Sequence, residues 1–122
     1  MITTQGKALS AYTTLLMMSK KPMNSLSSYK LFKIKKALAD IVEFQAEQER
    51  KLVANYGGSV NENGRVMFTD KTQEAEYGKA FKELQTLECE VNVEPIEMNP
   101  VEIPDMSISE IEILSPFIEW KE

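Results

Sequence analysis

Apolar residues recur at helical spacing from about Ser27 to Tyr56, which is the strongest pattern in the chain. At about 100° per residue, seven apolar side chains fall within a stripe roughly 100° wide, and charged residues occupy the opposite side. The stripe predicts one long helix, which Gly57-Gly58 ends because glycine readily adopts the left-handed cap conformation. The stripe residues are Leu31, Ile34, Leu38, Ile41, Val42, Leu52 and Tyr56.

Two features depart from this stripe. It turns polar at Gln45, Gln48 and Glu49, and Phe32 and Phe44 lie away from it. Aromatic residues at helical spacing usually pack in a core, so one interpretation is that the helix bends and both rings meet a neighbouring helix. The other interpretation is that part of the helix projects and the rings contact another molecule.

The segment before the long helix predicts a shorter helix, from Thr4 to about Lys20. Leu9, Tyr12 and Leu16 share one side of it. Pro22 then interrupts the pattern, since proline cannot continue a helix interior.

The segment after the long helix predicts a β-hairpin. Asn63-Gly64 lies between Ser59–Glu62 and Arg65–Phe68 and suits a two-residue type I′ turn. Asp70, followed by Gln73, resembles a capping box that opens another helix running to about Leu87. Together these segments predict an antiparallel helical hairpin with a β-hairpin insert.

Beyond Leu87 the apolar period changes from 3.6 to 2. Cys89–Glu94 alternates apolar and polar residues, which predicts a half-buried strand. A second extended piece, Ile96–Ile103, is confined to an edge or an irregular path by the prolines around it. Ser107 and Glu110 form a capping box for a short final helix, and the sequence leaves Phe117, Ile118 and Trp120 to pack or to bind.

These elements predict an α+β fold in a single domain, residues 1–122. Its parts are an N-terminal helix (1–22), the helical hairpin with its β insert (27–88), and a strand plus short helix (89–122). The length of 122 residues and the 43% content of apolar residues suit one domain with a real core.

The chain shows no sign of a membrane segment. No run reaches roughly 18 apolar residues, and the lysines near the N-terminus follow the apolar run of that segment, unlike those of a secretory signal. The lone Cys89 excludes an internal disulfide and fits a reducing compartment. We therefore expect an intracellular, cytoplasmic protein.

Charge is unevenly distributed. The first 39 residues contain seven lysines and no carboxylate, although the whole chain carries a net charge of −5. From Glu88 to Glu122 there are ten acids and one base. Such asymmetry is typical of an interaction surface, and it predicts complementary faces that pair within one chain, between two copies or with another protein.

Candidate catalytic chemistry is scarce. The chain contains no histidine, which removes the commonest general base and metal ligand, and it has no glycine-rich phosphate loop. Cys89 is interpreted as a small buried hydrophobe. The C-terminal acids match no calcium-loop spacing and are interpreted as a solvated face. We therefore expect no catalytic site, no metal and no cofactor. The acids in question are Glu88, Glu90, Glu94, Glu97, Glu102 and Asp105.

Lys30, Lys33 and Lys36 share one face of the long helix and resemble a phosphate-binding cluster. The cluster contains no arginine, the usual reader of bases. The protein is also acidic, unlike a typical nucleic-acid binder. These observations favour a protein partner over nucleic acid.

The order of several motifs resembles a group of small acidic proteins encoded by bacteriophages and prophages, mostly uncharacterised. The resemblance covers roughly Tyr29 to Trp120 and implies a phage protein in the cytoplasm of an infected bacterium, with no site residues to carry over. The motifs are Phe32–Leu38, Leu52–Gly57, Glu62–Gly64, Phe81–Leu87, Glu90–Val93, Ile108-Ser109 and Leu114–Glu119.

The sequence thus predicts a non-enzymatic protein that binds a host or phage protein, as an inhibitor or modulator. The alternatives are a virion or assembly component and a weak nucleic-acid-binding accessory protein. A second copy of the chain, bound through the long helix, is a further partner to consider. The predicted partner-binding residues are Lys30, Phe32, Lys33, Lys36 and Phe44.

Overall fold

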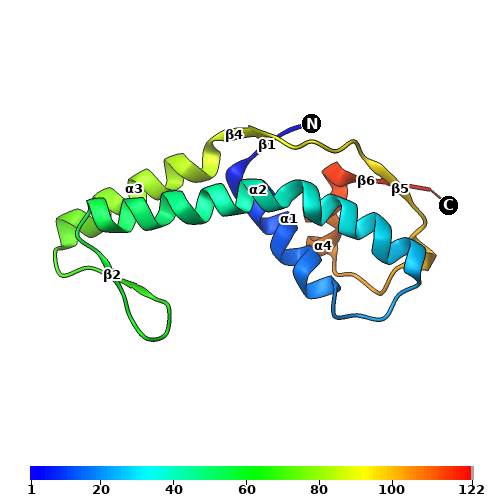
Figure 1. Ribbon diagram of the computed structural model, residues 1–122, viewed down its shortest axis with the longest axis horizontal. Coiled ribbons are helices and arrows are strands. Elements are labelled where there is room, and N and C mark those ends of the chain that lie inside the picture. Colours follow the sequence, from blue (N-terminus) through cyan, green and yellow to red (C-terminus); the bar gives the residue numbers. More distant parts are fainter. Residues whose placement is uncertain (122) are drawn as a thin grey trace.

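The computed structural model describes residues 1–121 and shows an α+β fold with two unequal parts (Figure 1). A compact head contains residues 1–41 and 87–121, and a projecting arm contains residues 42–86. The elements in chain order are β1 (Ile2–Thr4), α1 (Gln5–Met18), α2 (Ser25–Asn55), β2 (Ser59–Val60), β3 (Val66–Met67), α3 (Lys71–Thr86), β4 (Glu88–Glu90), β5 (Ile96–Met98), η1 (Pro100–Glu102), α4 (Ile108–Leu114), η2 (Ser115–Phe117) and β6 (Ile118–Trp120).

The hydrophobic core lies in the head, where both ends of the chain meet. On α1 the small residues Ala8 and Ala11 are fully buried, which allows α2 and α4 to pack closely against this helix. The predicted stripe of α2 supplies the opposite wall in its first half. The remaining buried members of this core are Leu15, Met18, Leu31, Ile34, Leu38, Val91, Met98, Leu114, Phe117 and Ile118.

The long helix α2 is confirmed, its C-terminal end is capped at Gly57-Gly58 as predicted, and its start lies two residues before the predicted Ser27. Asn24 caps the start, because its side chain accepts a hydrogen bond from the backbone N–H of Ser27 at 2.8 Å. At the other end Gly57 has a φ of +71°. The Gly57 N–H donates to the carbonyl of Ala54 and the Gly58 N–H to that of Val53, which is the Schellman arrangement.

Of the three residues in the polar break of the stripe, Gln45 is buried, whereas Gln48 and Glu49 are half-buried. Gln45 is only 1% exposed, although a glutamine normally lies at the surface. Its Nε2 donates to Glu49 at 3.4 Å, and its Oε1 has no hydrogen-bond partner. The position marks the point on α2 where the head ends and the arm begins.

The β-hairpin is confirmed, but the predicted type I′ turn is wrong. Strands β2 and β3 pair Val60 with Val66, and the backbones of Asn61 and Arg65 are also hydrogen-bonded, which leaves a three-residue loop. Gly64 has a φ of +78°, whereas Asn63 does not have a positive φ. The Asn61 Oδ1 accepts from the N–H groups of Asn63 and Arg65, both at 2.9 Å, and so stabilises this longer loop.

Helix α3 returns along α2 and completes the arm (Figure 1). The Asp70 carboxylate caps its start by accepting from the N–H groups of Thr72 and Gln73. The predicted capping box is incomplete, because the Gln73 side chain makes no hydrogen bond with the Asp70 backbone. No residue of α3 is buried. It packs against α1 and α2. It also carries a row of rings in which Tyr77 lies 5.0 Å from Phe68 and 6.0 Å from Phe81 between centroids.

Two pairs of short strands connect distant segments of the chain in the head, and only part of this pairing was predicted. Strand β4 overlaps the predicted strand Cys89–Glu94 only at Cys89 and Glu90, and Val91–Glu94 is irregular. Strand β4 pairs antiparallel with the N-terminal strand β1. Strand β5 pairs in parallel with β6. Strands β1 and β6 were not predicted, because three residues are too few to show an alternating pattern.

The C-terminal segment packs into the head. The capping box of α4 is complete, since Ser107 N–H donates to the Glu110 carboxylate at 2.8 Å and Glu110 N–H donates to Ser107 Oγ at 3.1 Å. Phe117 and Ile118, which the sequence left to pack or to bind, are buried core residues.

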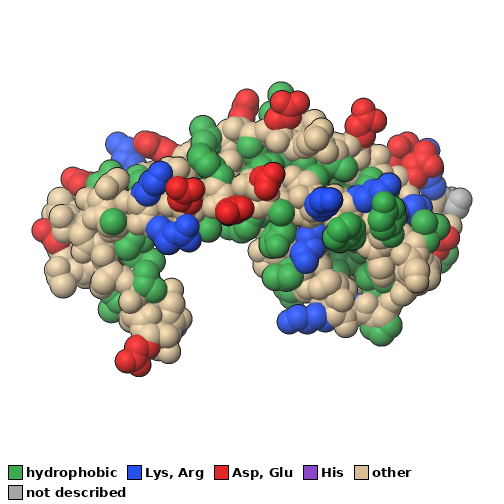
Figure 2. All heavy atoms as spheres, in the orientation of Figure 1, with side chains coloured by type: hydrophobic (Ala, Val, Ile, Leu, Met, Phe, Trp, Pro, Cys, Tyr) green, Lys and Arg blue, Asp and Glu red, His purple; other side chains and the backbone are tan. Residues whose placement is uncertain are grey.

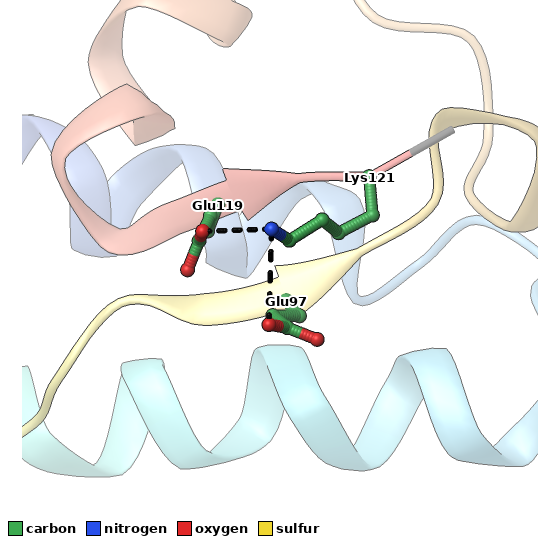
Figure 3. A network of polar contacts seen from close by, with 3 residues as sticks. All are labelled: Glu97, Glu119 and Lys121. Atoms are coloured by element: carbon green, nitrogen blue, oxygen red, sulfur yellow. Dashed lines mark ion pairs between the residues drawn. The ribbon is translucent and has the colours of Figure 1, made fainter.

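Beside β5 and β6, Lys121 is paired with two carboxylates (Figure 3). Glu97 and Glu119 are register partners on the parallel strands, so their like charges lie next to each other. Lys121 Nζ lies 3.0 Å from Glu119 and 4.0 Å from Glu97. Its backbone N–H also donates to the carbonyl of Met98. Glu122, part of the predicted acidic end, lies outside the described residues.

Candidate interaction surface

The outer side of α2 in the head carries two exposed aromatic rings. Tyr29 is 55% exposed and Phe32 is 52% exposed, and their rings are stacked with centroids 6.3 Å apart. The ammonium group of Lys33 lies 4.8 Å from the centre of the Tyr29 ring, within the range of a cation–π interaction. We call Tyr29, Phe32, Lys33 and Lys36 the α2 ridge.

The α2 ridge is flanked by two hollows. On the Phe32 side a pocket of about 150 Å³ opens between α1 and α2, with Leu15, Met23 and Leu31 among its lining residues. On the lysine side a groove of about 410 Å³ runs between α2 and the segment that follows β4, lined by Lys33, Lys36, Ala37, Asp40, Asn92 and Val93. Lys21 and Lys35 also line the pocket, so both flanks combine apolar surface with lysines.

The structure brings together three of the five residues expected to bind a partner. Phe32, Lys33 and Lys36 are exposed on neighbouring turns of α2, and Lys30 is half-buried beside them. Phe44 is 41% exposed, but it lies twelve residues after Phe32. At about 100° and 1.5 Å per residue, the two rings point about 120° apart and are separated by about 18 Å along the helix. They do not form one patch.

Both phenylalanines are more exposed than core residues, so the interpretation that both rings pack in a core is wrong. Contact of the rings with another molecule stays a prediction. Phe32 reaches the edge of the pocket against α1 but stays half in solvent. Tyr29 was missed as a member of the surface. Its spacing of three residues from Phe32 was the available signal, because residues three apart are neighbours on a helix.

The lysines of the first 39 residues form no ion pair with a carboxylate within residues 1–121. The pairs found there join Lys51 to Glu47 and Lys121 to Glu97 and Glu119. Lys21 Nζ does reach the C-terminal segment, where it donates to the backbone carbonyl of Asp105 at 3.3 Å. Figure 2 shows lysines over the head part of α2 and carboxylates along the upper edge that β4 and β5 follow. The complementary charges lie in one head without touching.

Other reactive groups of the sequence are in ordinary surroundings. Cys89 is partly buried against the core, and this burial raises the pKa of its thiol, which disfavours the nucleophilic thiolate. Between residues 1 and 121, no cluster of three or more His, Cys, Asp or Glu side chains is placed to hold a metal ion. None of the helices in this range combines the length and apolar character needed to cross a membrane.

No protein-family model, curated protein sequence or solved structure matches the chain.

Proposed function

We propose that this protein is a non-enzymatic protein-binding protein whose α2 ridge recognises an acidic surface with an apolar element. The observation that carries this proposal is the stacked pair of Tyr29 and Phe32, each more than half exposed beside lysines. Aromatic side chains are among the commonest residues to dominate binding energy at protein interfaces.

The rings are suited to binding because their contacts with each other and with Lys33 restrict their conformations before a partner binds. Tyr29 and Phe32 stack on each other, and Lys33 lies over the tyrosine ring. A preordered contact loses less conformational entropy when it is covered by a partner. The adjacent pocket between α1 and α2 offers a place for one apolar side chain of that partner.

The exposed lysines of the α2 ridge determine which charge a binding partner should carry. Lys33 and Lys36 are exposed, and they make no ion pair with the described carboxylates. Complementary charges of this kind mainly increase the association rate and orient the encounter, whereas the rings supply most of the affinity. The partner's site should therefore carry carboxylates around an apolar centre.

Single-stranded nucleic acid is the second candidate, because exposed rings next to lysines are also what bases and phosphates contact. Two observations count against it. The chain carries a net charge of −5, and Asp40 lines the same groove as Lys33 and Lys36. A carboxylate there repels a phosphate backbone.

The phage context that the sequence resemblance implies leaves two roles for a protein-binding protein. One is an inhibitor or modulator of a host or phage protein in the bacterial cytoplasm, which we favour because the ridge is a compact single site. The other is a virion or assembly component, and detection of the chain in purified particles would favour that role.

The ridge is tested by capture from a bacterial host lysate with crosslinking, followed by titration of the captured protein. Replacing both rings, Tyr29→Ala with Phe32→Ala, should weaken binding at least about a hundredfold, since two central aromatic residues are removed. Ile108→Ala is the matched control, because Ile108 is 78% exposed in α4, away from the ridge.

A second pair of variants measures the contribution of the lysines to binding separately from that of the rings. Lys33→Glu with Lys36→Glu should slow association, and Lys79→Glu with Lys82→Glu should not, although both pairs are exposed, three residues apart and change the charge equally. Equal capture by ridge and control variants would contradict the proposal. Capture that is nuclease-sensitive and falls steeply with salt would replace the protein partner by nucleic acid.

A further inference from the structure

The inner face of the arm holds an apolar groove that no other part of the described chain covers. The groove has a volume of about 300 Å³ and lies between the β2–β3 hairpin and the second half of α2. In Figure 2 the hairpin stands away from the head and leaves an open notch beside it. The lining residues are Ala46, Glu49, Arg50, Val53, Val60, Gly64, Val66 and Tyr77.

Several apolar side chains on this part of the arm are largely exposed to solvent. Val60 is 60% exposed and Met67 on the paired strand is 52% exposed. Tyr77 and the other residues of α3 are at best half-buried. Two helices and a hairpin of two-residue strands make an arm without a full core, and a further layer would bury this surface.

The rim of the groove carries one charge of each sign. Glu49 and Arg50 are consecutive residues on α2, and neither forms an ion pair with the described part of the chain. Glu49 lies close enough to Tyr77 for its charge to help raise the pKa of the tyrosine hydroxyl, after the effect of burial. The groove is thus close to neutral, unlike the basic α2 ridge.

A surface with adjacent opposite charges is complementary to itself. In a two-fold dimer residue i of one copy contacts residue j of the other, and j contacts i. Where the axis passes between Glu49 and Arg50, each Arg50 meets the Glu49 of the second copy, so two ion pairs form across apolar side chains. A partner of one sign would satisfy only one of these residues.

We propose that the arm is a dimerisation element in which the groove faces of two copies pack together, with reciprocal Arg50–Glu49 pairs at the centre. The residue types agree with this assignment, because arginine, methionine and aromatic residues are enriched at protein interfaces. Both arginines of the chain, Arg50 and Arg65, lie in the arm. The dimer does not depend on the α2 ridge, which lies on the head.

The test is the mass of the full chain in solution, measured by light scattering and sedimentation over a concentration series. The wild-type chain should form a dimer. Arg50→Glu should raise the dissociation constant at least about tenfold, since each copy then places two carboxylates against two others, and Glu49→Arg should do the same with two positive pairs. The doubly exchanged variant, Glu49→Arg with Arg50→Glu, should recover the dimer because it restores the pairing in reverse.

Lys51→Glu is the matched control. It changes the charge as much as Arg50→Glu does, one residue further along α2, but Lys51 does not line the groove and pairs with Glu47 at 3.6 Å. This variant should dimerise as the wild-type chain does. Val60→Asp, at a mostly exposed position, should weaken the dimer without unfolding the monomer, which circular dichroism would verify.

Several results would overturn this proposal. A wild-type chain that stays monomeric up to about 1 mM, the weak end of specific affinities, has no such dimer. A dimer that tolerates Arg50→Glu, or that the double exchange fails to restore, uses another surface. A monomeric chain whose captured lysate partner is lost with Arg50→Glu and Val60→Asp would assign the groove to a different protein.

Discussion

Gln45 is buried because of its position on α2, although its side chain is polar. It continues the inward side of α2, after Leu38 and before Val53, where an apolar residue would be expected. The helix carries it inside at the junction of head and arm. There its Oε1 accepts no hydrogen bond, and a buried unpartnered acceptor costs free energy.

Replacing this glutamine by an apolar residue of similar shape should stabilise the protein. We expect Gln45→Met to raise the free energy of unfolding by about 1 kcal/mol, because the unpartnered oxygen is removed and the volume is nearly kept. Denaturant unfolding measures the change. Gln48→Met, at a half-exposed position of the same helix, should change stability by less than about 0.5 kcal/mol. A loss of stability in Gln45→Met would mean that the amide has a partner, such as an enclosed water.

At the scale of elements, helices were predictable and short strands were not. The four α-helices were located within a few residues, because apolar residues recur in them at helical spacing and Pro22, Gly57 and Ser107 mark helix ends. The hairpin turn was mispredicted because the Asn61 side chain stabilises a longer loop than Asn-Gly usually forms. Strands β1 and β6 depend on partners far away in sequence, which no local pattern records.

The candidate site was predictable only in part for the same reason. Lys33, Lys36 and Phe32 follow from helical spacing, but their exposure depends on where α1 ends. Spacing alone also grouped Phe44 with Phe32, although the two point in different directions. The groove of the arm was not predicted, because it forms between Val53 on α2 and Val60 on the hairpin.

The capping box of α4 gives this element a defined response to pH. Hydrogen bonds from Ser107 hold the pKa of the Glu110 carboxyl below its ordinary value, so folding favours the charged form. The resulting stability is present above the unfolded-state pKa and is lost as the pH falls through the lower, folded-state pKa. We expect the wild-type chain to lose more stability between pH 7 and pH 3 than Glu110→Gln, which keeps the acceptor but does not titrate.

Unfolding by denaturant at a series of pH values measures this difference. Glu112→Gln is the control, since it removes the same charge from the same helix outside the capping box. A parallel pH dependence in Glu110→Gln and the wild-type chain would show that Glu110 stays equally charged in both states.

At the scale of the whole molecule, the head and the arm differ in how firmly they are held. The head encloses its core on several sides, whereas α3 has no buried residue. Local openings occur first where few apolar contacts must be broken. The arm should therefore open more often than the head.

Amide hydrogen exchange tests this expectation residue by residue. The slowest amides of α1 should exchange at least about tenfold more slowly than the slowest of α3, a difference of roughly 1.4 kcal/mol in opening free energy. The Arg50→Glu variant is the sample of choice, because pairing of two arms would add protection to the wild-type chain. Equal protection in α1 and α3 would instead describe one cooperative unit.

The pairing of β1 with β4 has a consequence for the order in which the protein can assemble during its synthesis. The strand made first pairs with residues 88–90, and the core beside it needs Phe117 and Ile118 near the end of the chain. The arm is not independent of the head, because helix α3 packs against α1 as well as against α2. The pair of α1 and α2 joins neighbouring segments and can form early with a small loss of chain entropy. The first residues to leave the ribosome must nevertheless wait for nearly the last before the head is complete.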